Sequence, residues 1–527
     1  MRGDWKTLLM LAAAAVTACS QDQVPEDSRQ PEDQLYHEMI QLGEKLDDPY
    51  TVDNMRAALA RVYPTKAGEV NLTATDLYVR FLPKSDAQFD LLLDRGLNLL
   101  DHPMDYRILR EGDYYHDPGL DEETITWQYA VVDKDFEFPE GVYYEVLDEC
   151  YISENDPVTR ASTGLDWEAV EREAYALTGN ADLWEASTKA GGDTYPEGRI
   201  TIEDPASGIG KPFGVAGVKV SCNSFVKFAS AYTDRDGYYR MEKKFSSKPR
   251  YRLVFSNQQG FCIGVNLVLV PASVSTLGTG TPAGIDYNVT TESEGKLFRR
   301  CVVNNAAYEY FTRCTEDDMG ILPPGQVLRI WILNSLDASS AIMMHQGAFV
   351  DGSSLLKGYL GPYTPLLKMI LPDITLGTSG LGDYQRIYAT TMHELAHASH
   401  YAQVGNAFWD KYIRYIMEAY VTEGKMAYGS GSREGSGYCE VGEMWAYFLE
   451  SVLFQDRYGG ALQPFGTSFW FYPQIFRYLY DRGMTRGELF RALTPSVTSR
   501  DDLKEELISL FPDRESIIRQ VFERYRR

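Results

Sequence analysis

The sequence predicts a multidomain α+β protein with three folded parts. These are an N-terminal α+β domain at residues 35–190, a central β-sandwich at 198–275 and a mainly helical C-terminal domain at 296–527. Three observations lead to this division. The chain has 527 residues, which is too many for a single hydrophobic core. Short β-rich segments separated by turn residues cluster in its middle, and hydrophobic residues at helical spacing dominate its C-terminal part.

The first domain mixes helix and strand signals. Residues 35–62 are predicted to be helical, because apolar residues recur at three- to four-residue spacing from Leu35 to Leu46. Ser85 is the predicted N-cap of another helix, which runs to Leu100. Strands are predicted at 76–83, 124–132 and 142–147. Its position ahead of the rest of the chain suggests an inhibitory, propeptide-like role as one hypothesis.

The central part has the pattern of an all-β domain. Its predicted strands lie at 199–203, 216–221, 225–231, 238–243, 251–255 and 265–270. The dipeptide Asp236-Gly237 predicts a tight turn. Two pieces, Ala216–Val220 and Thr233–Tyr239, resemble the carboxypeptidase regulatory-like (transthyretin-like) β-sandwich family. This resemblance implies a non-catalytic sandwich that spaces or supports a neighbouring domain.

The C-terminal part begins after a stretch rich in Ser, Thr and Gly at 273–296, which is predicted to be a linker or long loop. A helix is expected at 296–314, strands at 327–333 and 366–374, and a long helix at 382–404. Further helices are predicted at 408–427, 441–456, 469–482 and 485–493.

Charge and cysteine content limit the partners and the compartment. The formal net charge of −24 disfavours nucleic acid and anionic membrane surfaces, because phosphates would repel the chain. Apart from Cys19, the cysteines are Cys150, Cys222, Cys262, Cys301, Cys314 and Cys439. Two local disulfides, 222–262 and 301–314, and buried cysteines acting as small hydrophobic residues both remain open.

The first residues have the features of an export signal. Arg2 and Lys6 precede a short apolar run, which is too short to span a bilayer. The run ends in Val16–Cys19, which resembles the lipobox of bacterial lipoproteins. The resemblance implies a signal peptide at 1–18, lipidation of Cys19 and an outer-membrane or cell-surface location. An ordinary secretory signal cut near Ala18 is the alternative. The polar residues 19–34 are then a tether.

The most informative motif lies in the long helix predicted at 382–404. His393, Glu394 and His397 form a His-Glu-x-x-His sequence among uncharged neighbours from Thr390 to Ala398. Residues four apart share one helix face, so both histidines can bind the same metal ion. Glu394 then lies beside the metal, where it can accept a proton from a bound water. A zinc site is therefore expected here.

A third metal ligand has to come from elsewhere, because catalytic zinc usually takes three protein ligands. A third histidine at metzincin spacing is absent, and His400, one turn beyond His397, favours a surface or supporting role. At Cys439–Phe448 the chain resembles the gluzincins, whose third ligand is a Glu on a later helix. This resemblance implies Glu443. Glu440 and Glu418 remain alternatives, and the interval from His397 to Glu443 is longer than in most gluzincins.

The resemblance implies a zincin-like catalytic domain at 296–527 and an exported zinc metallopeptidase. Zn²⁺ would be its cofactor, Glu394 its general base and a peptide or protein its substrate. A lipid at Cys19 would provide the membrane contact. Tyr401, Tyr420 and Tyr438 are candidates for stabilising the oxyanion. The alternative is a non-catalytic surface lipoprotein for binding or adhesion, to which the 36 tyrosines would contribute peptide- or glycan-binding surfaces.

Overall fold

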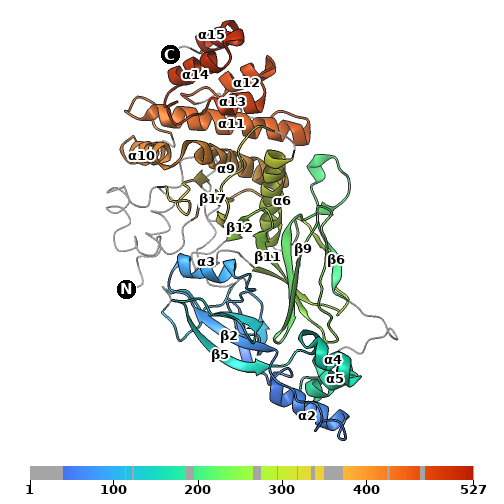
Figure 1. Ribbon diagram of the computed structural model, residues 1–527. Helices are drawn as coiled ribbons and strands as arrows, with labels where there is room; N and C mark the ends of the chain where they lie inside the picture. The colour runs from blue at the N-terminus through green and yellow to red at the C-terminus, as the bar shows by residue number, and fades with distance from the viewer. Residues whose placement is uncertain are drawn as a thin grey trace.

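The computed structural model describes residues 39–112, 114–121, 124–184, 195–264, 274–293, 295–316, 319–333, 339–348, 372–423, 428–462 and 469–525. The predicted signal peptide, tether and lipidated Cys19 lie outside these residues, as does the strand predicted at 265–270. The described chain is a multidomain α+β protein with a C-terminal helical region, as the sequence predicts (Figure 1).

The N-terminal part is built on a three-stranded antiparallel sheet. Its order is β4 (Gln128–Asp133), β2 (Asp76–Leu82) and β5 (Tyr143–Cys150), and its helices are α2 (Val52–Val62), α3 (Asp86–Asp94), α4 (Pro157–Thr163) and α5 (Trp167–Leu177). A separate pair joins β1 (Gln41–Lys45) to β3 (Tyr106–Arg110). The helix predicted at 35–62 is therefore wrong at β1, where pairing with a distant strand outweighs the local pattern.

An eight-stranded sheet forms the centre of the molecule. Its order is β16 (Ser340–Ala341), β17 (Ile374–Gly377), β15 (Leu328–Leu333), β12 (Phe261–Gly264), β11 (Arg250–Asn257), β8 (Val218–Ser224) and β9 (Lys227–Tyr232), with β13 (Val274–Thr279) also paired to β11. Strand β15 pairs in parallel with β12 on one side and with β17 on the other. The sheet therefore crosses the predicted boundary between 198–275 and 296–527. In a separate sandwich, one edge of β12 would remain unpaired, and here β15 pairs with that edge.

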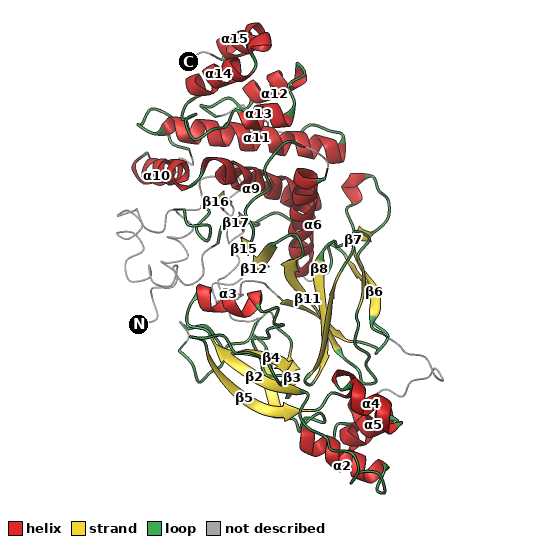
Figure 2. Cartoon of the chain, in the orientation of Figure 1, coloured by secondary structure: helices red, strands yellow, loops and turns green. Residues whose placement is uncertain are grey.

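A smaller sheet lies beside the large one in the middle of the chain (Figure 2). It consists of β10 (Tyr238–Arg240), β6 (Glu197–Ile202), β14 (Tyr287–Val289) and the short β7 (Phe213–Gly214). Val220 and Cys222 of β8 share a buried core with Ile200 and Ile202 of β6. Because side chains alternate along a strand, the opposite side of β8 faces away from this core.

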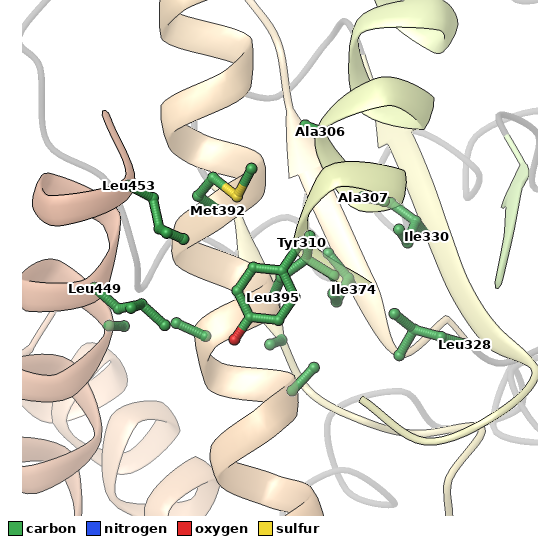
Figure 3. Close-up of a cluster of buried hydrophobic side chains, with 14 of the residues drawn as sticks. Ala306, Ala307, Tyr310, Leu328, Ile330, Ile374, Met392, Leu395, Leu449 and Leu453 are labelled. Atoms are coloured by element: carbon green, nitrogen blue, oxygen red, sulfur yellow. The ribbon is translucent and has the colours of Figure 1, made fainter. Parts of the chain in front are cut away.

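The C-terminal helices gather at the opposite end of the molecule from the N-terminal sheet (Figure 1). They are α9 (Tyr384–Val404), α10 (Asn406–Thr422), α11 (Ser436–Tyr458), α12 (Gln474–Asp481), α13 (Arg486–Arg491), α14 (Arg500–Leu510) and α15 (Glu515–Arg524), with α6 (Gly295–Thr315) between them and the sheets. Figure 3 shows Met392 and Leu395 of α9 among Tyr310 of α6 and Leu449 and Leu453 of α11. This part of the long helix thus lies inside the helical region, as the uncharged residues around the motif predict.

The cysteines do not stabilise the fold through the two local disulfides considered above. In the described part of the chain, no disulfide joins Cys222 to Cys262 or Cys301 to Cys314. Cys222 and Cys301 are fully buried in the main core, where they act as small apolar side chains. Among the described helices, none is long and apolar enough to cross a membrane.

Candidate metal centre

Helix α9 packs against the core on one side and carries its two histidines on another. Asp383 caps its N-terminus, where the carboxylate accepts a hydrogen bond from a backbone N–H of the first turn. Met392 and Leu395, three residues apart, pack into the core. His393 and His397, four residues apart, project from another side of the helix. Local helix periodicity is therefore sufficient to bring the two imidazoles together.

Helix α11 supplies the carboxylate. It packs along α9, where the indole N–H of Trp445 donates to the carbonyl oxygen of Ala396 at 3.2 Å. Ala446 is fully buried, and its small side chain allows this close approach. Glu443 lies on the same helix and is also fully buried. Packing between two long helices thus holds Glu443 opposite the histidine pair.

Three side chains from the two helices converge on one point. The Nε2 atoms of His393 and His397 are 3.2 Å apart. One carboxylate oxygen of Glu443 lies 3.5 Å from His393 Nε2, and the other lies 3.6 Å from His397 Nε2. A set of ligand atoms, one from each residue, lies within 4.8 Å of one another. This buried group could hold a metal ion.

The donor set fits a divalent cation. Burial raises the pKa of Glu443, but the neighbouring His397 and His393 lower it overall to about 2, so the carboxylate is ionised. Burial lowers the pKa of His397, which favours the neutral imidazole that metals bind. Two imidazole nitrogens and one anionic carboxylate are a common set for zinc, and they also suit other transition metals.

Glu394 is buried close to this cluster without a structural role of its own. Its side chain is 1% exposed, and neither carboxylate oxygen has a hydrogen-bond partner among the described residues. Burial raises its pKa to about 8. A buried polar group that stays unpaired costs stability, so such groups deserve a functional explanation. Glu394 therefore remains available for chemistry beside the cluster.

Two further residues orient the ligands. Glu450, on α11, lies with Oε2 at 2.9 Å from His393 Nδ1. Because a carboxylate accepts, His393 Nδ1 carries the hydrogen, which leaves Nε2 as the ring nitrogen that a metal can bind. Tyr412, on α10, donates its hydroxyl hydrogen to Glu443 Oε1. The ring of Tyr447 contacts His393 at a centroid distance of 4.5 Å.

The two alternative third ligands lie outside the cluster. Glu440, on α11, pairs with Arg500 at 3.7 Å. Glu418, on α10, pairs with Arg433 at 3.2 Å and is partly exposed. Of the three glutamates considered from the sequence, the structure brings only Glu443 to the two histidines.

The other candidates from the sequence have different surroundings. His400 is buried against Phe408 and Trp409 at ring distances of 5.1 and 5.7 Å, and burial lowers its pKa to about 3. Tyr401 donates to the carbonyl oxygen of Gln346 at 2.8 Å. Tyr438 accepts a hydrogen bond from the Lys411 ammonium at 3.1 Å. These contacts give His400, Tyr401 and Tyr438 partners outside the histidine–glutamate cluster.

Sequence reasoning missed Glu450 and Tyr412. Glu450 carries a usable signal, because it follows Glu443 by seven residues, or two helical turns, and so lies on the same face of α11. Tyr412 carries no such signal. It belongs to another helix, and only packing in three dimensions brings its hydroxyl to Glu443.

Comparison with known proteins adds no further assignment. No protein-family model, curated protein or solved structure matches the chain.

Proposed function

We propose that the protein is a zinc-dependent peptide hydrolase whose metal ligands are His393, His397 and Glu443. The observation that carries this proposal is the convergence of the three side chains next to Glu394, whose buried carboxylate has no partner among the described residues. Three protein ligands leave one coordination position open, which is the arrangement of catalytic rather than structural zinc. The resemblance to the gluzincins favours the same reading, with a zincin-like domain at 296–527.

The residues of the site have distinct tasks in this reaction. Zinc, when bound, would supply a water of lowered pKa and would polarise the carbonyl of the scissile bond. Glu394 takes a proton from the attacking water onto a carboxylate oxygen and releases it to the leaving amine as the C–N bond breaks. Glu450 holds His393 in the tautomer that leaves Nε2 free for a metal. Tyr412 fixes the Glu443 carboxylate.

The same proposal places the enzyme outside the cytoplasm. Its support is the resemblance of Val16–Cys19 to a lipobox, which implies a lipid at Cys19 and a location at the outer membrane or cell surface. Metabolic labelling with a radioactive fatty acid tests this point. Labelled wild-type protein and unlabelled Cys19→Ala protein are expected, whereas equal labelling would remove the lipid anchor from the proposal.

Metal analysis tests the ligand set directly. Purified protein is expected to contain about one zinc per chain, as the three-ligand site implies. His397→Ala and Glu443→Gln should both lose it, because the first removes a ligand nitrogen and the second replaces the anionic carboxylate by a neutral amide that binds the cation weakly. Glu418→Gln is the matched control for Glu443→Gln, since it makes the same change at a glutamate that faces Arg433. Metal retained by Glu443→Gln, or lost by Glu418→Gln, would refute the assignment.

Peptide cleavage tests the reaction. A diverse peptide library incubated with the metal-loaded protein should be hydrolysed. Glu394→Gln should lose hydrolysis by at least about a hundredfold while keeping its metal, because general-base catalysis contributes about 10²–10⁴-fold. Metal bound without any cleavage would instead favour the non-catalytic binding or adhesion lipoprotein.

A further inference from the structure

A partly open cavity lies between the N-terminal part and the large sheet, and His393, His397 and Glu443 are not among its lining residues. Its volume is about 400 Å³, within the range of small-molecule sites. Helix α3 lines one side with Phe89 and Leu93, and the following loop adds residues 97–101. Strands β8, β9, β11 and β12 line the other side. The cavity therefore belongs to a domain interface, where ligand sites are frequent.

The sheet presents an unusual face to this cavity. Along β8, Val220 and Cys222 point into the main core, so Lys219, Ser221 and Asn223 point the other way. This polar side of a central strand is covered by the N-terminal part rather than by water. Polar side chains at such positions are costly unless they are hydrogen-bonded. The alternation therefore indicates that the polar side serves a purpose other than packing.

Lys219 is a cation without a counter-ion. Its ammonium donates to the neutral amide oxygen of Asn98 at 3.4 Å and lies 5.5 Å from the ring centre of Tyr232. No carboxylate lies within 4 Å of it in the part of the chain that the structure describes. Burial lowers the pKa of Lys219, and no acidic neighbour offsets this effect. An anion entering the cavity would supply the missing charge.

Ser221 provides a second, independent indication. It is fully buried and lines the cavity, and its hydroxyl has no hydrogen-bond partner among the described residues. Ser221 and Lys219 lie two residues apart on the same side of β8, so one small head group can reach both. Three aspartates also line the cavity. Asp90 of α3 is paired with Arg329 at 2.8 Å, Asp101 accepts a hydrogen bond from the backbone N–H of Tyr115 at 2.6 Å, and Asp94 is exposed.

The rest of the lining is mainly apolar. Phe89, Leu97, Phe228, Val254 and Phe261 supply most of it, and the uncharged polar or imidazole side chains among the others are Asn98, Gln128, Ser256, Asn257 and His345. A ligand that fits must therefore combine an apolar body with one charged end. A single lysine with a single hydroxyl matches a head group that carries one negative charge.

We propose that this cavity binds a small amphipathic anion, with its head group on Lys219 and Ser221 and its apolar body against α3, Phe228 and Phe261. The site is separate from the metal centre and does not depend on its function. A medium-chain carboxylate is the simplest molecule with this chemistry.

Three probes with the same chain and different head groups test the proposal. Octanoate, 1-octanol and octylamine are titrated into the purified full chain, and binding is followed by isothermal titration calorimetry. Octanoate should bind once per chain and at least about tenfold more tightly than octanol, since a charge-assisted hydrogen bond separates the two. Equal binding of octanoate and octanol, or tightest binding of octylamine, overturns the proposal without any variant.

Substitutions then locate the head group. Lys219→Met should weaken octanoate by at least about tenfold and leave octanol unchanged. Lys211→Met, at an exposed lysine, is the matched control. Val254→Phe, which fills the cavity, should abolish binding of both probes. Unchanged octanoate affinity in Lys219→Met overturns the assignment. If Lys219→Met also loses octanol binding, Lys219→Gln repeats the test with an uncharged polar side chain that is shorter than lysine.

Glu443→Gln separates this site from the proposed metal centre. The variant should bind octanoate as the unaltered chain does, because Glu443 lies on α11 and outside the cavity lining. Loss of octanoate binding in Glu443→Gln would show that the two sites are not separate and would overturn this part of the proposal.

Discussion

Substitution of Glu450 tests whether metal affinity depends on the residue that orients His393. Glu450 Oε2 lies 2.9 Å from His393 Nδ1. A hydrogen bond to a charged group contributes about 1.5–3 kcal/mol, whereas a neutral one contributes about 0.5–1.5 kcal/mol. Glu450→Gln keeps an acceptor oxygen but loses the charge, so zinc affinity should fall about five- to tenfold. Glu450→Leu removes acceptor and charge, and affinity should fall about 10–100-fold.

The assay is competition between the protein and a chromophoric chelator for zinc, which gives the dissociation constant of each variant. Glu440→Gln is the matched control. It removes the same charge from the same helix, but Glu440 faces Arg500 at 3.7 Å and no ligand. Zinc affinity should be highest with Glu at position 450, lower with Gln and lowest with Leu. This graded order distinguishes loss of His393 orientation from a general effect on folding. The reasoning is refuted if Glu450→Leu binds zinc as tightly as the unaltered protein, or if Glu440→Gln loses as much.

Three more predictions concern the other supports of the fold and site. Tyr412→Phe should weaken zinc about tenfold in the same competition assay, because it removes the donor to Glu443, while Tyr401→Phe should not. Leu395→Ala should lower the free energy of unfolding by about 2–5 kcal/mol in urea, against little change for the exposed Leu109→Ala. Lys227→Met should cost about 3–5 kcal/mol at neutral pH, because it leaves the buried Glu171 without its cation. Burial already raises the pKa of Glu171, and loss of Lys227 raises it further. The folded variant therefore keeps a proton on Glu171 at pH values where the unfolded chain has released it. The deficit should therefore grow as pH rises above the ordinary pKa of a glutamate, and a deficit that shrinks instead would contradict the assignment.

The parts of the site that lie close together in sequence could be predicted. His393 and His397 share a face because they belong to one helix, and the uncharged residues around them indicate that the helix is buried. Helix α9 begins and ends within two residues of the predicted limits 382–404. Choosing Glu443 required the gluzincin resemblance, because helix periodicity alone does not distinguish it from Glu440 or Glu418.

The parts that depend on distant pairing could not be predicted. Apolar residues recur at helical spacing from Leu35 to Leu46. Residues 41–45 within this stretch nevertheless form β1, because β3 offers them a partner strand. The predicted end of the sandwich near 275 has a similar limit. The sequence pattern does not predict β12 at Phe261–Gly264, and it does not show that β15 pairs with this strand and continues the sheet. Strand order follows from tertiary packing, which local patterns do not record.

Ion pairs with buried cations hold the N-terminal part to the large sheet, so removing one partner is expected to destabilise the fold. The buried ammonium of Lys227, on β9, lies 2.7 Å from Glu154 and 3.2 Å from Glu171, which both belong to the N-terminal part. Arg329 of β15 pairs in the same way with Asp90 of α3. Each cation is 1% exposed. Deletion of the N-terminal part would remove both carboxylates that pair with the buried Lys227, at a cost of several kcal/mol.

This arrangement decides how the inhibitory hypothesis for the N-terminal part has to be tested. Strand β15 also pairs with β17, which precedes the metal-site helix α9, so a truncation would disturb the sheet that supports the site. Lower activity after truncation would then report damage to the sheet rather than the absence of inhibition. Substitutions that preserve the ion pairs are required instead. Leu91→Ala, at an exposed position of α3, is one such change. Only a gain of peptide hydrolysis with an unchanged free energy of unfolding would support inhibition.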